Sequence, residues 1–121
     1  WNWGSALVEN LKADTHLVID GAPRKMHEAE VLDSAFKFYG RNNVSIIFLN
    51  VSEEWAKERL MGRQRGDDKK DEINRRLGWY KTEVLPVVDF FKKHKIYRFI
   101  DIKGEQPIEK VHSDIVANLK L

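Results

Sequence analysis

One near-continuous apolar run, 44–51 (VSIIFLNV), constrains the fold of this chain more than any other feature. Apolar side chains occupy both sets of alternating positions, so a strand formed here would be apolar on both faces. Such a strand is typical of a parallel sheet that is covered by helices on both sides. Shorter runs at 17–20 and 96–102 predict two further strands. The sequence therefore predicts an α/β fold with a parallel sheet.

Helical periodicity fills the segments between these strands. A proline inside the longest pattern should bend or divide that helix. We expect the aromatic residues Trp79 and Tyr80, which lie in the same pattern, to be part of the core. The predicted helices are 6–12, 28–39 with Gly40 as C-cap, 53–61 with Ser52 as N-cap, 71–94 interrupted at Pro86, and a last helix from Pro107 to 119.

Length and composition limit the classes of protein that remain. The 121 residues suit a single domain, and 42% hydrophobic with 33% charged residues is ordinary for a globular protein. A net charge of +2 is no nucleic-acid signature, and the absence of cysteine with four scattered histidines argues against a zinc site. No apolar run approaches the length that spans a bilayer. We expect a cytoplasmic monomer with no nucleic-acid or membrane partner.

The first candidate site is the sequence Asp20-Gly21-Ala22-Pro23-Arg24, at the end of the first predicted strand. A carboxylate in this place can hold a magnesium ion through water. The glycine and proline turn the chain sharply, and the planar guanidinium that follows matches phosphate oxygens in a bidentate way. The alternative is a simple turn with a solvated arginine.

The second candidate site is a cluster of arginines that begins on one predicted helix and ends on the next. Arg59 and Arg63 are four residues apart, so they share one helix face and repel each other unless an anion lies between them. The alternative is a solvated pair of helices held by salt bridges. The charged residues of this cluster are Arg59, Arg63, Arg65, Asp67, Asp68 and Arg76.

Together the two sites resemble the nucleoside monophosphate kinases, most closely the short-lid adenylate kinases. The order Arg-x-x-x-Arg, Arg-x-Asp-Asp and Arg-Leu-x-x-Tyr carries the resemblance. It implies a P-loop-kinase-like, three-layer α/β/α fold, in one domain 1–121 with a short lid at about 63–68. It also implies ATP-dependent phosphoryl transfer to a nucleoside monophosphate with Mg²⁺, converting ATP and AMP to two ADP.

The resemblance also assigns roles by position. The catalytic residues would be Arg24, Arg63, Arg65 and Arg76. Arg24 would bind the α-phosphate of the acceptor, and Asp20 would order magnesium through water. Arg59 would stack on the base of the donor, Arg63 and Arg65 would hold its terminal phosphates, and Arg76 would reach the point of transfer.

Glu28 departs from the family pattern, which usually has a glutamine that reads the adenine edge. An ionised glutamate can only accept hydrogen bonds, so it suits the two adjacent donors of guanine better than adenine. The structural alternative is a carboxylate in the first turn of a helix, where negative charge is favourable. The base of the acceptor therefore stays open.

The sequence contains no Gly-x-x-x-x-Gly-Lys-Ser/Thr, the loop that cradles the donor phosphates in this family. We therefore expect a sheet that is incomplete in its N-terminal part, in a chain that does not fold and catalyse unaided. The missing part would lie either on another segment or, as we favour, in a longer enzyme of which this chain is a truncated piece. Two alternatives to an adenylate kinase remain. One is a catalytically inactive nucleotide-binding fragment or interaction module, and the other is a small P-loop kinase with another acceptor such as GMP.

Overall fold

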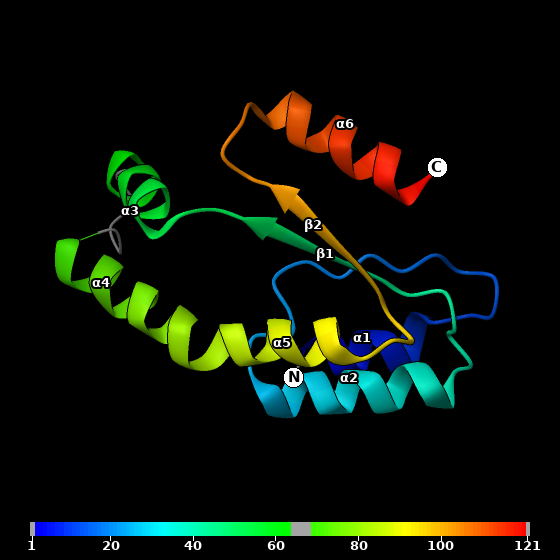
Figure 1. The fold of residues 1–121 in the computed structure, drawn as a ribbon. Coiled ribbons are helices and arrows are strands. Elements are labelled where there is room, and N and C mark those ends of the chain that lie inside the picture. The colour runs from blue at the N-terminus through cyan, green and yellow to red at the C-terminus, as the bar shows by residue number, and fades with distance from the viewer. Residues whose placement is uncertain (1, 64–68, 121) are drawn as a thin grey trace.

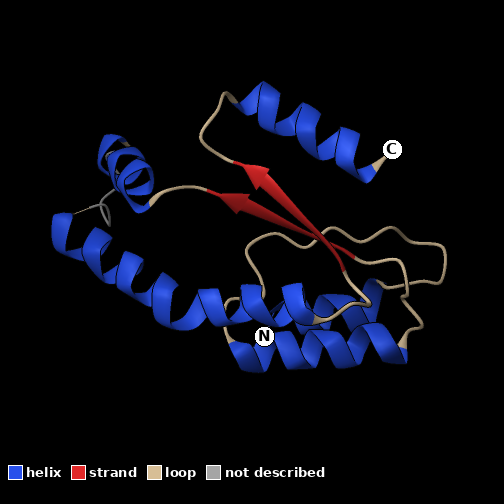
Figure 2. Ribbon diagram, viewed as in Figure 1, coloured by secondary structure: helices blue, strands red, loops and turns tan. Residues whose placement is uncertain are grey.

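The computed structural model describes residues 2–63 and 69–120, which form helices around a small parallel sheet (Figures 1 and 2). Strand β1 (Ser45–Asn50) pairs with β2 (Arg98–Lys103) in parallel. Helix α6 (Ile108–Leu119) lies on one side of the sheet, and α1 (Asn2–Asn10), α2 (Met26–Phe38) and α5 (Leu85–Lys93) lie on the other. The predicted α/β class, with a parallel sheet and helices on both sides, is confirmed.

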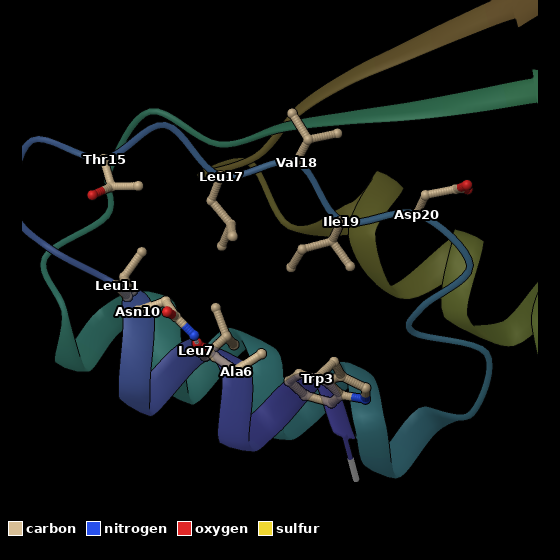
Figure 3. Close-up of a pocket in the computed structure, with 10 residues that line it drawn as sticks. All are labelled: Trp3, Ala6, Leu7, Asn10, Leu11, Thr15, Leu17, Val18, Ile19 and Asp20. Carbon is tan, nitrogen blue, oxygen red and sulfur yellow. Dashed lines mark hydrogen bonds between the residues drawn. The ribbon is translucent and has the colours of Figure 1, made fainter.

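The predicted strand 17–20 is wrong, because the structure has an extended, irregular segment there. Its side chains alternate as in a strand: Leu17 and Ile19 point toward α1, whereas Val18 points away (Figure 3). A strand also needs a hydrogen-bonded neighbour, and neither described strand pairs with this segment. Val18 is consequently 92% exposed.

The other predicted elements are confirmed, with shifts of a few residues at their ends. Helix α3 (Glu53–Gly62) begins after Ser52, whose side-chain oxygen accepts a hydrogen bond from the Trp55 amide at 3.2 Å. Helix α2 ends before Gly40, which has the positive φ of +63° that glycine adopts readily after a helix. These ends were predictable because a single residue next to the helix determines each of them.

Pro86 divides the long helical pattern, as predicted. Helix α4 (Lys70–Trp79) continues into a π-helical turn, η1 (Tyr80–Val84), and then into α5. In this wider turn the Leu85 amide donates to the Tyr80 carbonyl, five residues earlier. A proline lacks the amide that an α-helix needs and its ring crowds the preceding turn, which is why the register changes next to Pro86.

The prediction that Trp79 and Tyr80 belong to the core is wrong. Their exposed fractions are 56% and 38%. The reason is that α4 extends past the end of the sheet, where α3 is its neighbour (Figure 1). Apolar periodicity predicts the helix, but it does not predict which of its turns are buried in the core.

The core lies between the sheet and the layer of α1, α2 and α5. Its buried residues include Leu32, Phe36 and Phe91, around a polar pair formed by Asp33 and Tyr97. The Tyr97 hydroxyl donates to one Asp33 carboxylate oxygen, and the Lys37 ammonium lies 2.7 Å from the other. Burial alone would raise the pKa of Asp33, but these two donors outweigh it and the pKa is lowered. The pair ties α2 to the start of β2.

In residues 2–63 and 69–120, no helix is long and apolar enough to cross a membrane.

Candidate functional site

The turn that carries Arg24 is compact and leaves its acidic residue in solvent. Gly21 has a φ of +77°, a conformation that favours glycine, and α2 begins shortly after the turn. The Arg24 guanidinium folds back against this glycine, since a Cβ added to Gly21 would lie 3.4 Å from Arg24 Nη2. Asp20 is exposed at the end of the preceding extended segment (Figure 3). The turn therefore places the Arg24 guanidinium close to Gly21, the residue that follows the exposed Asp20.

Glu28 is linked to the same turn. Its Oε2 accepts a hydrogen bond from the Arg24 backbone amide at 2.8 Å, from a position in the first turn of α2. The carboxylate thus satisfies an amide at the start of a helix, where its negative charge is also favoured by the helix dipole. This contact supports the structural explanation of Glu28, while its role as a reader of the acceptor base stays a prediction.

The second group of arginines lies on α3 and α4. The Arg59 guanidinium carbon is 4.9 Å from the centre of the Trp55 ring, so the cation lies over an aromatic face one turn earlier in α3. Arg63 is the exposed C-cap residue of α3, and Arg76 is exposed on α4. Arg65 and the predicted lid, apart from Arg63, lie outside the described residues.

Two side-chain contacts hold the arginine-bearing elements together. The Lys81 ammonium in η1 lies 2.5 Å from Glu53 in the first turn of α3. The Lys25 ammonium lies 5.4 Å from the centre of the Trp79 ring, at the end of α4. Lys25 follows Arg24 directly, and Trp79 lies about one helical turn after Arg76. The fold therefore brings the Arg24 turn and the Arg76 helix side by side, although they are far apart in the sequence.

Glu105 is a residue that sequence reasoning missed. Its Oε1 accepts from the Ser52 amide at 2.6 Å, so the loop after β2 holds the loop that leads from β1 into α3. The hydrogen bonds from Ser52 keep the pKa of Glu105 below its usual value. Next to it, the Gly104 amide donates to the Asn50 carbonyl at 2.8 Å. The one sequence signal was its place just after a strand, where parallel sheets hold their functional loops.

No metal cluster is present within residues 2–63 and 69–120. There, no group of three or more histidine, cysteine, aspartate or glutamate side chains could hold a metal ion. Magnesium needs fewer protein ligands than this, because it is usually bound through one or two carboxylates together with phosphates and water. The exposed Asp20 beside the Arg24 turn fits that mode of binding.

The described residues form a partial α/β fold, and comparison with known sequences specifies the family. The chain belongs to the adenylate kinase family, whose sequence model matches residues 4–96. It is 36% identical over 106 residues to the adenylate kinase of Helicobacter hepaticus, covering 86% of this chain and 55% of that protein. It is 28% identical over 112 residues to adenylate kinase 1 of a Nostoc species, covering 93% of this chain and 60% of that protein.

A third relative is the adenylate kinase of Corynebacterium glutamicum, 30% identical over 109 residues, with 90% of this chain and 58% of that protein covered. The chain thus spans between 55% and 60% of the length of these three curated relatives. The predicted kinship with the nucleoside monophosphate kinases is confirmed.

Proposed function

We propose that this chain supplies the acceptor-binding turn and the transfer arginines of an adenylate kinase, which converts ATP and AMP to two ADP. The observation that carries the proposal is the approach of the Arg24 turn to α4 through Lys25 and Trp79. This approach brings the Arg24 turn beside the helix that carries Arg76, which supports a shared phosphate site. Membership of the adenylate kinase family supports the same reaction.

In this proposal the arginines act by position and charge. Arg24 binds the α-phosphate of AMP, and Arg76 neutralises charge on the phosphoryl group during transfer. Arg63 and Arg65 hold the terminal phosphates of ATP, and Arg59 stacks on its base. The acceptor phosphate is already ionised at neutral pH, so the reaction needs no general base and no protein nucleophile.

We assign magnesium to Asp20, through water. The ion, when bound, would neutralise the phosphates of ATP and orient them for transfer. Asp20 would order the water molecules around it, which requires a carboxylate that solvent can reach. The cytoplasmic location and the monomeric state remain predictions.

A GMP kinase is the second candidate, and it rests on the glutamate at position 28. An ionised carboxylate accepts hydrogen bonds, and the guanine edge offers two adjacent donors where adenine offers a donor beside an acceptor. The hydrogen bond from the Arg24 amide to Glu28 engages one carboxylate oxygen. A third candidate, nucleotide binding without catalysis, rests on the absence of the P-loop motif from the sequence.

The proposal is tested by phosphotransfer from Mg-ATP to AMP, GMP, CMP and UMP, together with calorimetric binding of each monophosphate. Turnover with AMP supports the adenylate kinase, and a preference for GMP supports the second candidate. Because the sequence has no P-loop motif, preferential binding of AMP or of GMP distinguishes the first two candidates even without turnover, and turnover with any monophosphate would contradict the third.

A single substitution tests the acceptor site separately. Arg24→Ala should abolish binding of the monophosphate, because it removes the bidentate phosphate ligand. Arg75→Ala is the matched control, since Arg75 is an exposed arginine on α4 that pairs with Glu72 at 2.7 Å. Retained affinity in the Arg24→Ala protein would contradict the assigned role.

A further inference from the structure

Lys25 and Trp79 form a contact in which the tryptophan is largely exposed. Trp79 leaves 56% of its surface in water, although a large apolar ring is more stable when it is covered. The Lys25 ammonium lies 5.4 Å from the ring centre, within the range of a cation–π interaction. An exposed tryptophan at the end of a helix is thus partly covered by a cation from another element.

The position of each partner gives the contact its meaning. Lys25 is the N-cap residue of α2 and directly follows Arg24. Trp79 is the last residue of α4 and lies on the same side of the helix as Arg76, three residues earlier. The contact therefore links the backbone that follows Arg24 to the helix that carries Arg76.

We propose that Lys25 and Trp79 are positioning residues, whose contact holds the Arg24 turn at a set distance from α4. Its catalytic meaning rests on the proposed function, since it would keep a phosphate bound by Arg24 within reach of Arg76. Neither Lys25 nor Trp79 is assigned a contact with substrate.

The distance between α2 and α4 can be measured without any nucleotide. The sequence has no cysteine, so spin labels attach only to cysteines that are introduced. Glu30 on α2 and Asn74 on α4 are exposed and suit the labels. Pulsed electron paramagnetic resonance then gives the distribution of distances between the two helices.

The variants distinguish the effect of the Lys25 charge and the Trp79 ring from that of any other surface substitution. Lys25→Gln and Trp79→Leu remove the cation and the aromatic face, and both should broaden the distance distribution. Lys25→Arg keeps the cation, and Trp79→Phe keeps an aromatic face, so both should preserve it. Lys92→Gln is the matched control, because it removes a similar contact, with the Lys92 ammonium 6.0 Å from the Phe99 ring centre. An unchanged distribution in the Lys25→Gln protein would overturn the proposal.

Binding of AMP tests the catalytic meaning. Lys25→Gln should weaken AMP binding about two- to fivefold, the range expected for an exposed cation–π contact, and Lys25→Arg should restore it. Equal AMP affinity in Lys25→Gln and the unaltered chain would overturn the link to phosphate binding. Failure of the unaltered chain to bind AMP would count against the proposed function itself, and the label distances would still decide whether the contact positions the turn.

Discussion

Replacement of Tyr97 by phenylalanine should destabilise the protein through one hydrogen bond. Tyr97 and Asp33 are each only 7% exposed, and the Tyr97 hydroxyl donates to the Asp33 carboxylate. The substitution removes that donor and leaves the aromatic ring in place. The Asp33 carboxylate then keeps the Lys37 ammonium, 2.7 Å away, as its remaining charged partner.

The size of the effect follows from the charge on the acceptor. A hydrogen bond to a charged group contributes about 1.5–3 kcal/mol, more than one between neutral groups. The ring contacts of Tyr97 with Phe36 and Phe91, at centroid distances of 6.2 and 5.1 Å, survive the change. We therefore expect a loss of about 1.5–3 kcal/mol in the free energy of unfolding. Each kcal/mol lost should lower Tm by about 3–6 °C.

The loss should depend on pH at both ends of the scale. Burial raises the pKa of Asp33, but the hydrogen bonds from Lys37 and Tyr97 lower it by more than burial raises it. The carboxyl group is therefore more acidic in the native state than in the unfolded state. Its contribution to stability is present above about pH 4 and is lost as the pH falls through the native pKa. Burial and the Asp33 hydrogen bond raise the pKa of Tyr97. Its contribution is present below about pH 10 and is lost at higher pH.

Urea unfolding at pH 7, followed by far-ultraviolet circular dichroism, measures the loss directly. A double-mutant cycle with Asp33→Asn isolates the hydrogen bond from other effects of either substitution. The two losses should not add fully, because Tyr97→Phe removes the donor of this hydrogen bond and Asp33→Asn removes the charge of its acceptor. Losses that add fully, or a Tyr97→Phe effect below about 0.5 kcal/mol, would refute the reasoning.

Two further predictions concern the loops that follow the strands. Gly104→Ala should lower the free energy of unfolding by about 1–3 kcal/mol, because the new Cβ would lie 2.5 Å from Val51 Cγ1. Adding Val51→Ala to this variant should recover part of the loss, as measured by urea unfolding. Fully additive losses in the double mutant would contradict the clash. Ser52→Ala should cost about 1 kcal/mol, because the Trp55 amide loses its acceptor, whereas Ser52→Thr should keep most of the stability. Equal thermal stability of the Ser52→Ala and unaltered proteins would show that the cap contributes nothing.

Elements that depend on local chemistry could be predicted from the sequence. The run 44–51 predicted β1 because its apolar residues occupy both faces, and Ser52 predicted the start of α3 because an N-cap acts on its own helix. Pro86 predicted a division because it lacks an amide wherever it lies. The order of the arginine motifs predicted the family, which the comparison confirmed.

Features that depend on a partner far along the chain could not be predicted from the sequence and are seen only in the folded structure. The segment 17–20 has the alternation of a strand, but neither of the described strands pairs with it, and Trp79 has the periodicity of a core residue but lies beyond the sheet. The approach of Lys25 to Trp79 likewise joins elements that only the fold brings together. Hydrogen bonds between strands, burial and cation–π contacts each require two segments of the chain. A local sequence pattern describes one of these segments, and tertiary packing determines which segment becomes its partner.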